Sequence, residues 1–375
     1  MADLVVVAMS GGVDSSVAAA LLKEQGYNVI GVTLNVWPEQ GPAEHGVRHD
    51  GCCSLDSVED ARRVANELGI PHYTLNFRDL FDQAVVQNFL AEYQSGRTPN
   101  PCVRCNRFIK FEALMAKARS WGARHLATGH YARVDRSPEG RFTLRKAADP
   151  FKDQSYALYS LTQEQLAFTL FPLGELAKAE TRRMAADLGL VTAQKAESQE
   201  ICFVPDDDYA EYLRQRVPAT AKPGPIRNRR GDVLGTHQGI AFYTVGQRKG
   251  LGIAVGRPLY VLEIVPRENA IVVGEEDEVY SRGLVADDLN WVSVGEPTEP
   301  IRANARIRYR SAEVPAVAWM QQDGTLAVEF DEPQRAVSPG QAVVLYQGDR
   351  VVGGGTIKGA VSRRQSAIGQ AARCR

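Results

Sequence analysis

The stretch LVVVAMSGGVDSS, residues 4–16, decides the fold of this chain. Its first part, residues 4–9, is a short apolar and largely β-branched run, which predicts a buried strand. The pair Gly11-Gly12 then predicts a tight turn, and apolar residues at helical spacing over 17–22 predict a helix that ends near Gly26. A strand joined to a helix by a glycine turn is a typical opening of a parallel α/β sheet.

The same alternation continues through the first half of the chain. Strands are expected at 28–36, 72–77 and 125–130, and helices at 56–69, 79–93 and 107–120. Because the expected strands are separated by expected helices, the first half predicts a Rossmann-like parallel sheet covered by helices.

The pattern changes after about residue 205. Runs punctuated by Gly and Pro, such as 239–246 and 257–265, predict short strands and hairpins. From about residue 284 the alternation repeats and predicts a second all-β unit, a barrel. The expected domains are the α/β domain at 1–206, a small central β domain at 207–280, and a C-terminal β-barrel with a basic tail at 281–375.

Composition excludes several classes of protein. The 375 residues are 44% hydrophobic, with 44 Lys and Arg against 45 Asp and Glu, which excludes collagen-like, disordered and small disulfide-rich chains. The net charge of -1 argues against a nucleic-acid binder, but the charge is unevenly distributed: residues 94–110 hold four Lys or Arg and no acid.

No apolar run approaches the roughly 18 residues that span a bilayer, and no basic region precedes an N-terminal apolar run, so we expect a cytoplasmic protein without membrane contact.

The loop SGGVDSS, residues 10–16, has the chemistry of a phosphate site. Two glycines let the backbone approach an anion, and successive N–H groups at a helix N-terminus supply partial positive charge. The loop is neither a Walker A loop, because no Gly-Lys-Ser/Thr follows, nor the G-x-G-x-x-G dinucleotide motif. It predicts an anion held mainly by backbone amides and serine hydroxyls; a plain strand-to-helix turn with a serine cap is the alternative.

Cysteines are the second candidate centre. Cys102 and Cys105 form a C-x-x-C pair just before an expected helix, where the helix N-terminus and neighbouring arginines favour thiolate. Cys202, between Ile and Phe, is a further candidate. Half of a zinc site, an iron–sulfur cluster on these three cysteines, and inert core residues are the alternatives.

The loop resembles the pyrophosphate loop of the ATP pyrophosphatase superfamily, a PP-loop domain of the adenine nucleotide α-hydrolase type. Further motifs, found in the family's order from residue 8 to beyond residue 355, resemble the tRNA-specific 2-thiouridylase family. These motifs are TPNPCVRCNRFIKF, ATGHYAR, KDQSYALY, ESQEICF, TVGQRKGLG, RIRYR and SPGQAVVLY.

The resemblance implies a reaction and its partners. ATP with Mg²⁺ would adenylate the C2 oxygen of the wobble uridine of tRNA, and a cysteine persulfide would then deliver sulfur to C2 as AMP leaves. The sulfur would come from a cysteine desulfurase, directly or through relay proteins, and the enzyme would act as a monomer. Two alternatives are another adenylating ligase with a small substrate and a non-catalytic tRNA-binding module.

The resemblance also implies roles for single residues. The catalytic residues would be Cys105 as nucleophile, Cys202 as persulfide carrier and Asp14 beside magnesium and phosphates. Many relatives carry Asp where this chain has Cys102, so Cys102 stays the alternative nucleophile. ATP would contact Ala8, Met9, Ser10, Gly11, Gly12, Val13, Asp14, Ser15, Leu34 and Gly129. tRNA would contact Asn100, Pro101, Cys102, His130, Lys152, Asp153, Gln154, Arg308, Tyr309 and Gln341.

Two of these assignments have structural alternatives. His130 would otherwise be a hydrogen-bonded structural histidine beside Tyr131. RIRYR would otherwise be a solvated strand face, on which alternation puts Arg306, Arg308 and Arg310 together. Lys152-Asp153-Gln154 follows a proline and predicts a surface loop. No role is expected for Cys52, Cys53 or Cys374.

Overall fold

A computed structural model describes residues 2–36, 55–196, 201–204 and 208–361. The chain divides into two compact units. Unit 1 comprises residues 1–86, 101–208 and 348–351, and unit 2 comprises residues 87–100, 209–347 and 352–375. Cys52, Cys53 and Cys374 lie outside the described residues.

The centre of unit 1 is a parallel five-stranded sheet in the order β3-β2-β1-β4-β7. Its strands are β1 (Leu4–Ala8), β2 (Asn28–Asn35), β3 (His72–Asn76), β4 (His125–Thr128) and β7 (Thr169–Leu170). The chain leaves β1 toward β2 on one side, and β4 pairs with β1 on the other. Ligands bind at such a reversal of strand order, beyond the carboxyl ends of the strands. The expected Rossmann-like sheet is confirmed.

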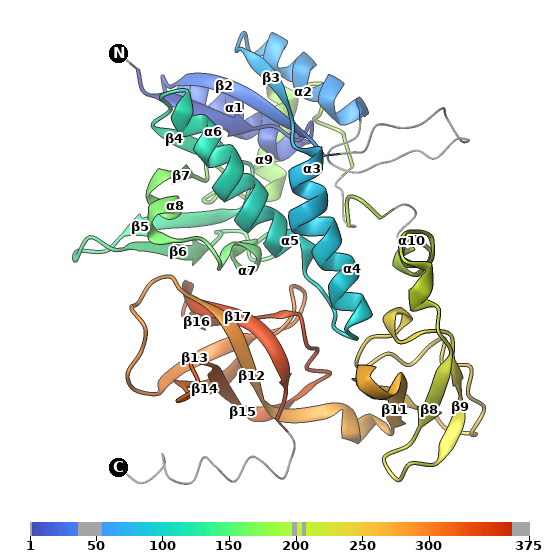
Figure 1. Ribbon diagram of the computed structural model, residues 1–375. Coiled ribbons are helices and arrows are strands. Elements are labelled where there is room, and N and C mark those ends of the chain that lie inside the picture. The colour runs from blue at the N-terminus through green and yellow to red at the C-terminus, as the bar shows by residue number, and fades with distance from the viewer. Residues whose placement is uncertain (1, 37–54, 197–200, 205–207, 362–375) are drawn as a thin grey trace. The chain divides into compact units, whose positions relative to one another are not determined.

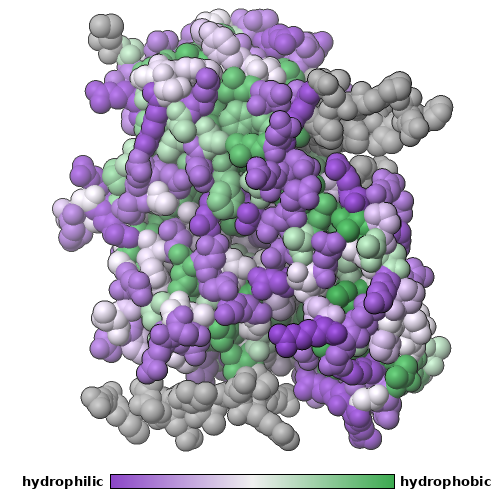
Figure 2. Space-filling model, in the orientation of Figure 1, coloured by the Kyte–Doolittle hydropathy of each residue, from purple (hydrophilic) through white to green (hydrophobic). Residues whose placement is uncertain are grey.

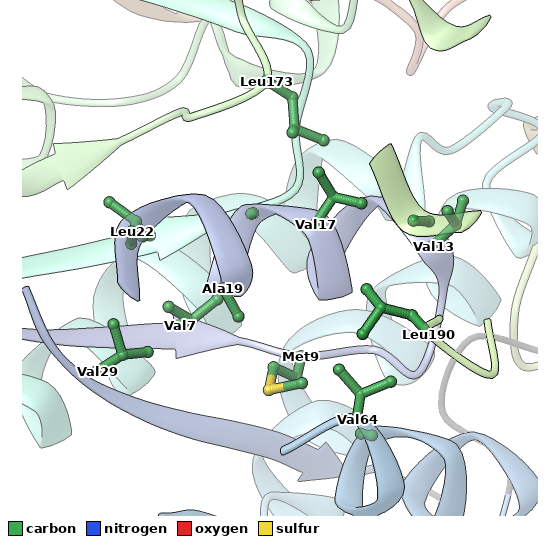
Figure 3. Packing of buried hydrophobic residues seen from close by; sticks show 14 of the residues in the cluster. Val7, Met9, Val13, Val17, Ala19, Leu22, Val29, Val64, Leu173 and Leu190 are labelled. Atoms are coloured by element: carbon green, nitrogen blue, oxygen red, sulfur yellow. The ribbon is translucent and has the colours of Figure 1, made fainter. Parts of the chain in front are cut away.

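The core of unit 1 forms where the first helix packs on the sheet. Helix α1 (Val13–Glu24) and helix α2 (Leu55–Glu67) flank β1 and β2 (Figure 1). Figure 3 shows Ala19 of α1 next to Val7 of β1, Val17 on the opposite side of α1 toward Leu173, and Val64 of α2 beside Met9. Val7, Val17 and Ala19 have no exposed surface. Burial of these apolar side chains fixes the start of α1 and therefore the loop before it.

Helices and a hairpin complete unit 1. Helices are α3 (Arg78–Phe81), the π-helix η1 (Asp82–Val86), α5 (Pro101–Arg104), the π-helix η2 (Cys105–Leu114), α6 (Met115–Ser120), α7 (Ser155–Leu158), α8 (Gln163–Phe168) and α9 (Lys178–Asp187). Strands β5 (Ala132–Arg136) and β6 (Phe142–Lys146) form an antiparallel hairpin. The helix expected at 107–120 starts earlier, at Pro101, because proline lacks the N–H that the first helical position leaves unbonded.

Unit 2 contains a small sheet and a closed barrel, as expected. Helices α4 (Gln87–Gln94) and α10 (Tyr209–Arg216) accompany a sheet of β8 (Gly224–Arg227), β9 (Val233–His237), β10 (Tyr260–Val265) and β11 (Ala270–Gly274), in the order β10-β11-β8-β9. The barrel strands are β12 (Tyr280–Trp291), β13 (Ile301–Arg306), β14 (Val314–Met320), β15 (Leu326–Arg335), β16 (Ala342–Gln347) and β17 (Arg350–Ala360). Pairing of β12 with β17 closes the barrel.

The strand expected through RIRYR, residues 306–310, is wrong beyond the first residue of the motif. Strand β13 ends at Arg306, and a turn follows in which the Ser311 N–H donates to the Arg308 carbonyl at 3.1 Å. The Ser311 hydroxyl accepts from the Arg308 N–H at 3.2 Å and closes the turn from the other side. Arg306, Arg308 and Arg310 therefore do not share one strand face.

The surface drawn in Figure 2 is mostly hydrophilic, with hydrophobic residues in small groups. Among the helices of the described residues, none is both long and apolar enough to cross a membrane.

Candidate active site

The loop between β1 and α1 needs glycine at its turn. Gly11 has φ +67°, and a Cβ there would lie 2.0 Å from the Ser57 carbonyl oxygen. Gly12 is extended and is the N-cap of α1. The hydroxyls of Ser15 and Ser16 both donate to the Gly12 carbonyl, at 3.1 and 2.9 Å, and Ser15 Oγ accepts from the Ser10 N–H at 3.1 Å. The serines therefore hold the shape of the loop.

Gly129 lies directly against this loop. It follows β4, and a Cβ there would lie 2.6 Å from Ser15 N and 3.0 Å from Asp14 Cβ. Leu34 is a buried residue near the carboxyl end of β2. The two predicted adenosine-contacting positions thus stand on the two strands that flank β1, at the same end of the sheet.

Asp14, in the first turn of α1, bonds side chains that come from distant parts of the chain. Lys178 Nζ, from the first residue of α9, lies 2.6 Å from Asp14 Oδ1 and 2.8 Å from Oδ2. Tyr131 Oη lies 2.8 Å from Asp14 Oδ1 and 2.9 Å from Thr181 Oγ1. Because a carboxylate only accepts, the tyrosine hydroxyl donates to Asp14. Neither Lys178 nor Tyr131 was among the sequence-predicted site residues, since each lies far from the loop in the chain.

The C-x-x-C pair lies on one continuous helical segment. Pro101 begins α5, so Cys102 is in the first turn and Cys105 begins the π-helical stretch η2. Cys102 is exposed and Cys105 is half-buried. The expectation that Cys105 stands just before a helix is therefore wrong, and the helix N-terminus acts more strongly on Cys102, because its field falls off within the first turn. π-helical stretches occur frequently at functional sites.

The segments of Cys105 and Cys202 are anchored on the same helical stretch, residues 78–86. Arg104 Nε, next to Cys105, donates to the Ala84 carbonyl at 2.9 Å. Cys202 is half-buried in a turn, and the neighbouring Phe203 packs edge-on against Phe81 with ring centroids 5.7 Å apart. Two cysteines separated by almost a hundred positions in the sequence thus have neighbours on one short helical segment.

The predicted tRNA loop at 152–154 is only partly a surface loop. Asp153 is buried, and its carboxylate accepts from Ala147 N–H at 3.2 Å and from Ser155 N–H at 3.1 Å. Gln154 Oε1 accepts from the Tyr131 N–H at 2.9 Å. The expectation of exposure is therefore wrong for Asp153, whose carboxylate instead fixes the loop. Lys152 is half-buried.

His130 has protein partners on both ring nitrogens. Nδ1 lies 2.7 Å from Thr128 Oγ1, and Nε2 lies 3.4 Å from Lys110 Nζ. Because an ammonium group only donates, Nε2 accepts and Nδ1–H donates to Thr128. Burial, and then the Lys110 charge, lower the pKa of His130 well below its ordinary value. These contacts favour the structural histidine over a tRNA contact.

The lowered pKa of the half-buried His130 imidazole predicts acid sensitivity. Because the folded-state pKa of His130 is lowered, the stability it provides is complete above the unfolded pKa of about 6.5 and is lost as pH falls. We expect the free energy of unfolding to fall by up to about 1.4 kcal/mol per pH unit below pH 6 for this one group. Urea unfolding at pH 7.5, 6.5 and 5.5 measures the slope, and His130→Gln should flatten it. An unchanged slope in the variant contradicts the assignment.

The barrel positions predicted to bind tRNA are largely engaged inside unit 2. Arg308 donates to the Ala336 carbonyl and, at 3.1 Å, to Ser338 Oγ. Gln341 Nε2 donates to the carbonyls of Thr98 and Pro99, at 3.1 and 2.9 Å. Tyr309 is 40% exposed and remains accessible. Asn100, also in unit 2, directly follows the backbone that Gln341 holds.

Gln341→Ala should loosen this backbone. The Thr98 N–H donates to the Pro339 carbonyl at 2.8 Å, so its hydrogen exchange reports local opening. Losing two hydrogen bonds should cost about 1–2 kcal/mol and speed Thr98 exchange roughly tenfold. Gln347→Ala, which removes a comparable bond to the Arg302 carbonyl, is the control and should leave Thr98 unchanged. Equal exchange rates of the Thr98 amide in the wild type and both variants would show that Gln341 does not stabilise this backbone.

Metal ligation was one of the alternatives for the cysteines. In the described ranges, no group of three or more His, Cys, Asp or Glu side chains is arranged to hold a metal ion.

Comparison with known proteins identifies the family. Residues 3–206 match the model of the tRNA methyl transferase HUP domain, 210–275 that of the tRNA methyl transferase PRC-barrel domain, and 281–357 that of the aminomethyltransferase β-barrel domain. The tRNA-specific 2-thiouridylase MnmA of Moorella thermoacetica is 58% identical over 353 residues, which cover 94% of this chain and 98% of the relative. That of Heliobacterium modesticaldum is 55% identical over 360 residues, covering 95% and 93%. The chain therefore belongs to the tRNA-specific 2-thiouridylase family of enzymes.

Proposed function

We propose that this enzyme 2-thiolates the wobble uridine of tRNA in two steps: ATP adenylates the C2 oxygen, and a persulfide on Cys202 then replaces it with sulfur. One observation carries the proposal beyond the family assignment. A phosphate-type loop and two cysteine segments anchored on residues 78–86 belong to the same unit. The proposed domains are the PP-loop catalytic domain at 1–206, a central β domain at 207–280 and a C-terminal barrel at 281–375.

The first step makes a leaving group. A uridine C2 oxygen leaves poorly, so it attacks the α phosphorus of ATP, and the bond from that phosphorus to pyrophosphate breaks. Backbone N–H groups of residues 10–15 hold the phosphates, and Leu34 and Gly129 border the adenosine. These roles are supported by the close fit of Gly129 to the loop.

Magnesium is the ion whose chemistry fits Asp14. Mg²⁺ is commonly held by one or two carboxylates together with substrate phosphates. Asp14 is a carboxylate on the loop whose side chain is 31% exposed, so it can reach such an ion. The ion supplies positive charge that stabilises the departing pyrophosphate.

The second step transfers sulfur. The terminal sulfur of the Cys202 persulfide attacks C2, and AMP leaves with the former C2 oxygen. The Cys105 thiolate then attacks the Cys202 sulfur, the S–S bond to the transferred sulfur breaks with its electron pair, and a C2=S group forms. The product enzyme holds a Cys105–Cys202 disulfide, which a thiol reductant must reduce before another turnover.

The partners follow from this chemistry. The substrate is tRNA, which contacts the exposed Tyr309 and the segment at Asn100-Pro101-Cys102. The persulfide comes from a cysteine desulfurase, directly or through relay proteins, and the enzyme works in the cytoplasm as a monomer. A ligase using the same loop on a small substrate is the alternative; it would not need Cys105 or Cys202.

The test combines product and binding measurements. Unmodified tRNA, ATP, Mg²⁺ and a persulfide source should give 2-thiouridine and AMP in equal amounts. tRNA affinity should fall on the order of a thousand-fold between about 50 and 200 mM salt if about six phosphates are contacted. Thiolation without AMP would contradict the adenylation step, and a flat salt response would contradict tRNA as the substrate.

A further inference from the structure

The phosphate loop lacks a full positive charge of its own. Residues 10–16 contain no Lys or Arg, and the hydroxyls of Ser15 and Ser16 donate to the Gly12 carbonyl instead of outward. Backbone N–H groups supply only partial charges. Breaking the bond to pyrophosphate, however, puts a full additional negative charge on the leaving group. A cationic side chain from outside the loop, acting together with the proposed magnesium ion, would stabilise this charge.

Lys178 is placed to supply that cation. It is the first residue of α9, and its N–H donates to Asp149 Oδ2 at 3.0 Å, which fixes the start of the helix. Its ammonium bonds both oxygens of Asp14 and lies 5.6 Å from the centre of the Tyr131 ring. The Lys178 side chain is only 10% exposed, whereas that of Asp14 is 31% exposed, so the ammonium is largely removed from water while the carboxylate is still partly accessible. Its charge acts strongly on whatever occupies the loop, because screening is weak there.

Binding of Mg²⁺ and ATP would favour an exchange of partners in this ion pair. Lys178 covers both oxygens of Asp14, and an ammonium beside a divalent cation on the same oxygens would be repelled. A phosphate oxygen offers the ammonium an equivalent charge-assisted bond. Such an exchange would keep every charge paired, because Asp14 would hold the metal and the Lys178 ammonium would bind phosphate.

We propose that Lys178 moves from Asp14 to the β and γ phosphates of ATP and stays with pyrophosphate as it leaves. This inference rests on the proposed adenylation. The C2 oxygen bonds to the α phosphorus, the bond from that phosphorus to the bridging oxygen breaks, and the electron pair stays on that oxygen, beside Lys178. The N3–H proton of the uridine is lost to solvent, and Lys178 itself transfers no proton. Lys178 would therefore be a catalytic residue, and Asp14 its resting partner.

Nucleotide binding without tRNA separates this role from a purely structural one. The full chain would be titrated calorimetrically with Mg²⁺·ATP and, separately, with AMP. Lys178→Met should lower the affinity for ATP roughly 10–100-fold, which corresponds to the loss of one charge-assisted hydrogen bond. AMP affinity should change less than about threefold, because AMP lacks the β and γ phosphates. Lys178→Arg should keep most of the ATP affinity. Lys23→Met is the matched control: this lysine, in the last turn of α1, donates to the Leu68 carbonyl.

Two results overturn the inference. One is ATP affinity within threefold of wild type in Lys178→Met; the other is an equal loss of ATP and AMP affinity, which is the signature of a lysine that only holds Asp14 in place. If the methionine variant does not fold, Lys178→Gln keeps a hydrogen-bond donor for Asp14 while removing the charge, and the same criteria apply. Failure of the wild-type enzyme to form AMP with tRNA would instead contradict the proposed function, whatever the binding data show.

Discussion

Replacing Cys105 with serine is expected to stop 2-thiouridine formation, by on the order of a thousand-fold or more, as for other essential nucleophiles. Serine cannot attack the Cys202 sulfur, so the transferred sulfur stays bonded to the enzyme. Adenylation needs neither thiol, and pyrophosphate release should continue for one turnover per enzyme. Rapid-quench measurement of pyrophosphate and thiolated nucleoside, in the same samples, separates the two steps.

Cys102→Ser tests the alternative nucleophile. Cys102 lies in the first turn of the helical segment and is exposed, whereas Cys105 is half-buried beside Arg104, whose side chain reaches the Ala84 carbonyl. We expect Cys102→Ser to raise KM for tRNA and to leave the chemical step within a few-fold of wild type. Thiolation that survives Cys105→Ser but not Cys102→Ser would exchange the two roles.

Gly129→Ala is expected to lower kcat/KM for ATP by roughly 100-fold, because a displacement of about 1 Å at a reacting centre has effects of that size. The added Cβ would lie 2.6 Å from Ser15 N and 2.7 Å from the Asp14 carbonyl carbon, so the first turn of α1 must move. Overpacking should also cost about 1–3 kcal/mol of stability.

A matched glycine isolates the steric effect. Gly295→Ala adds the same methyl group where no heavy atom lies within 4 Å, and should alter neither ATP use nor stability. AMP formation at varied ATP concentration, together with thermal unfolding of both variants, provides the comparison. A wild-type kcat/KM for ATP in Gly129→Ala would mean that Gly129, after β4, does not pack closely against Asp14 and Ser15 of the phosphate loop.

The sequence predicted the loop and the sheet because their signals are local. The apolar run at 4–9, the glycine turn and the helical spacing after it each act over a few residues, and β1 and α1 form where expected. The strand predicted through RIRYR is wrong because the alternation of residue types does not reveal the turn that Ser311 closes on Arg308. The division into three domains and the roles of the cysteines remain predictions.

Contacts between residues that lie far apart in the chain could not be predicted from the sequence. Asp is a residue type common in loops, yet Asp153 is buried, and its carboxylate accepts hydrogen bonds from backbone N–H groups. Lys178 stands in an ordinary amphipathic helix, 164 positions from Asp14, and no local pattern pairs the two. Such contacts depend on how β4, β7 and α9 assemble around the loop, which only the folded chain determines.

The fate of one oxygen atom tests the central claim most directly. tRNA carrying ¹⁸O at C2 of the wobble uridine would be thiolated with ATP, Mg²⁺ and a persulfide source, and the AMP examined by mass spectrometry. Adenylation of the C2 oxygen predicts AMP heavier by two mass units, in an amount equal to the 2-thiouridine formed. Unlabelled AMP alongside full thiolation would contradict the account.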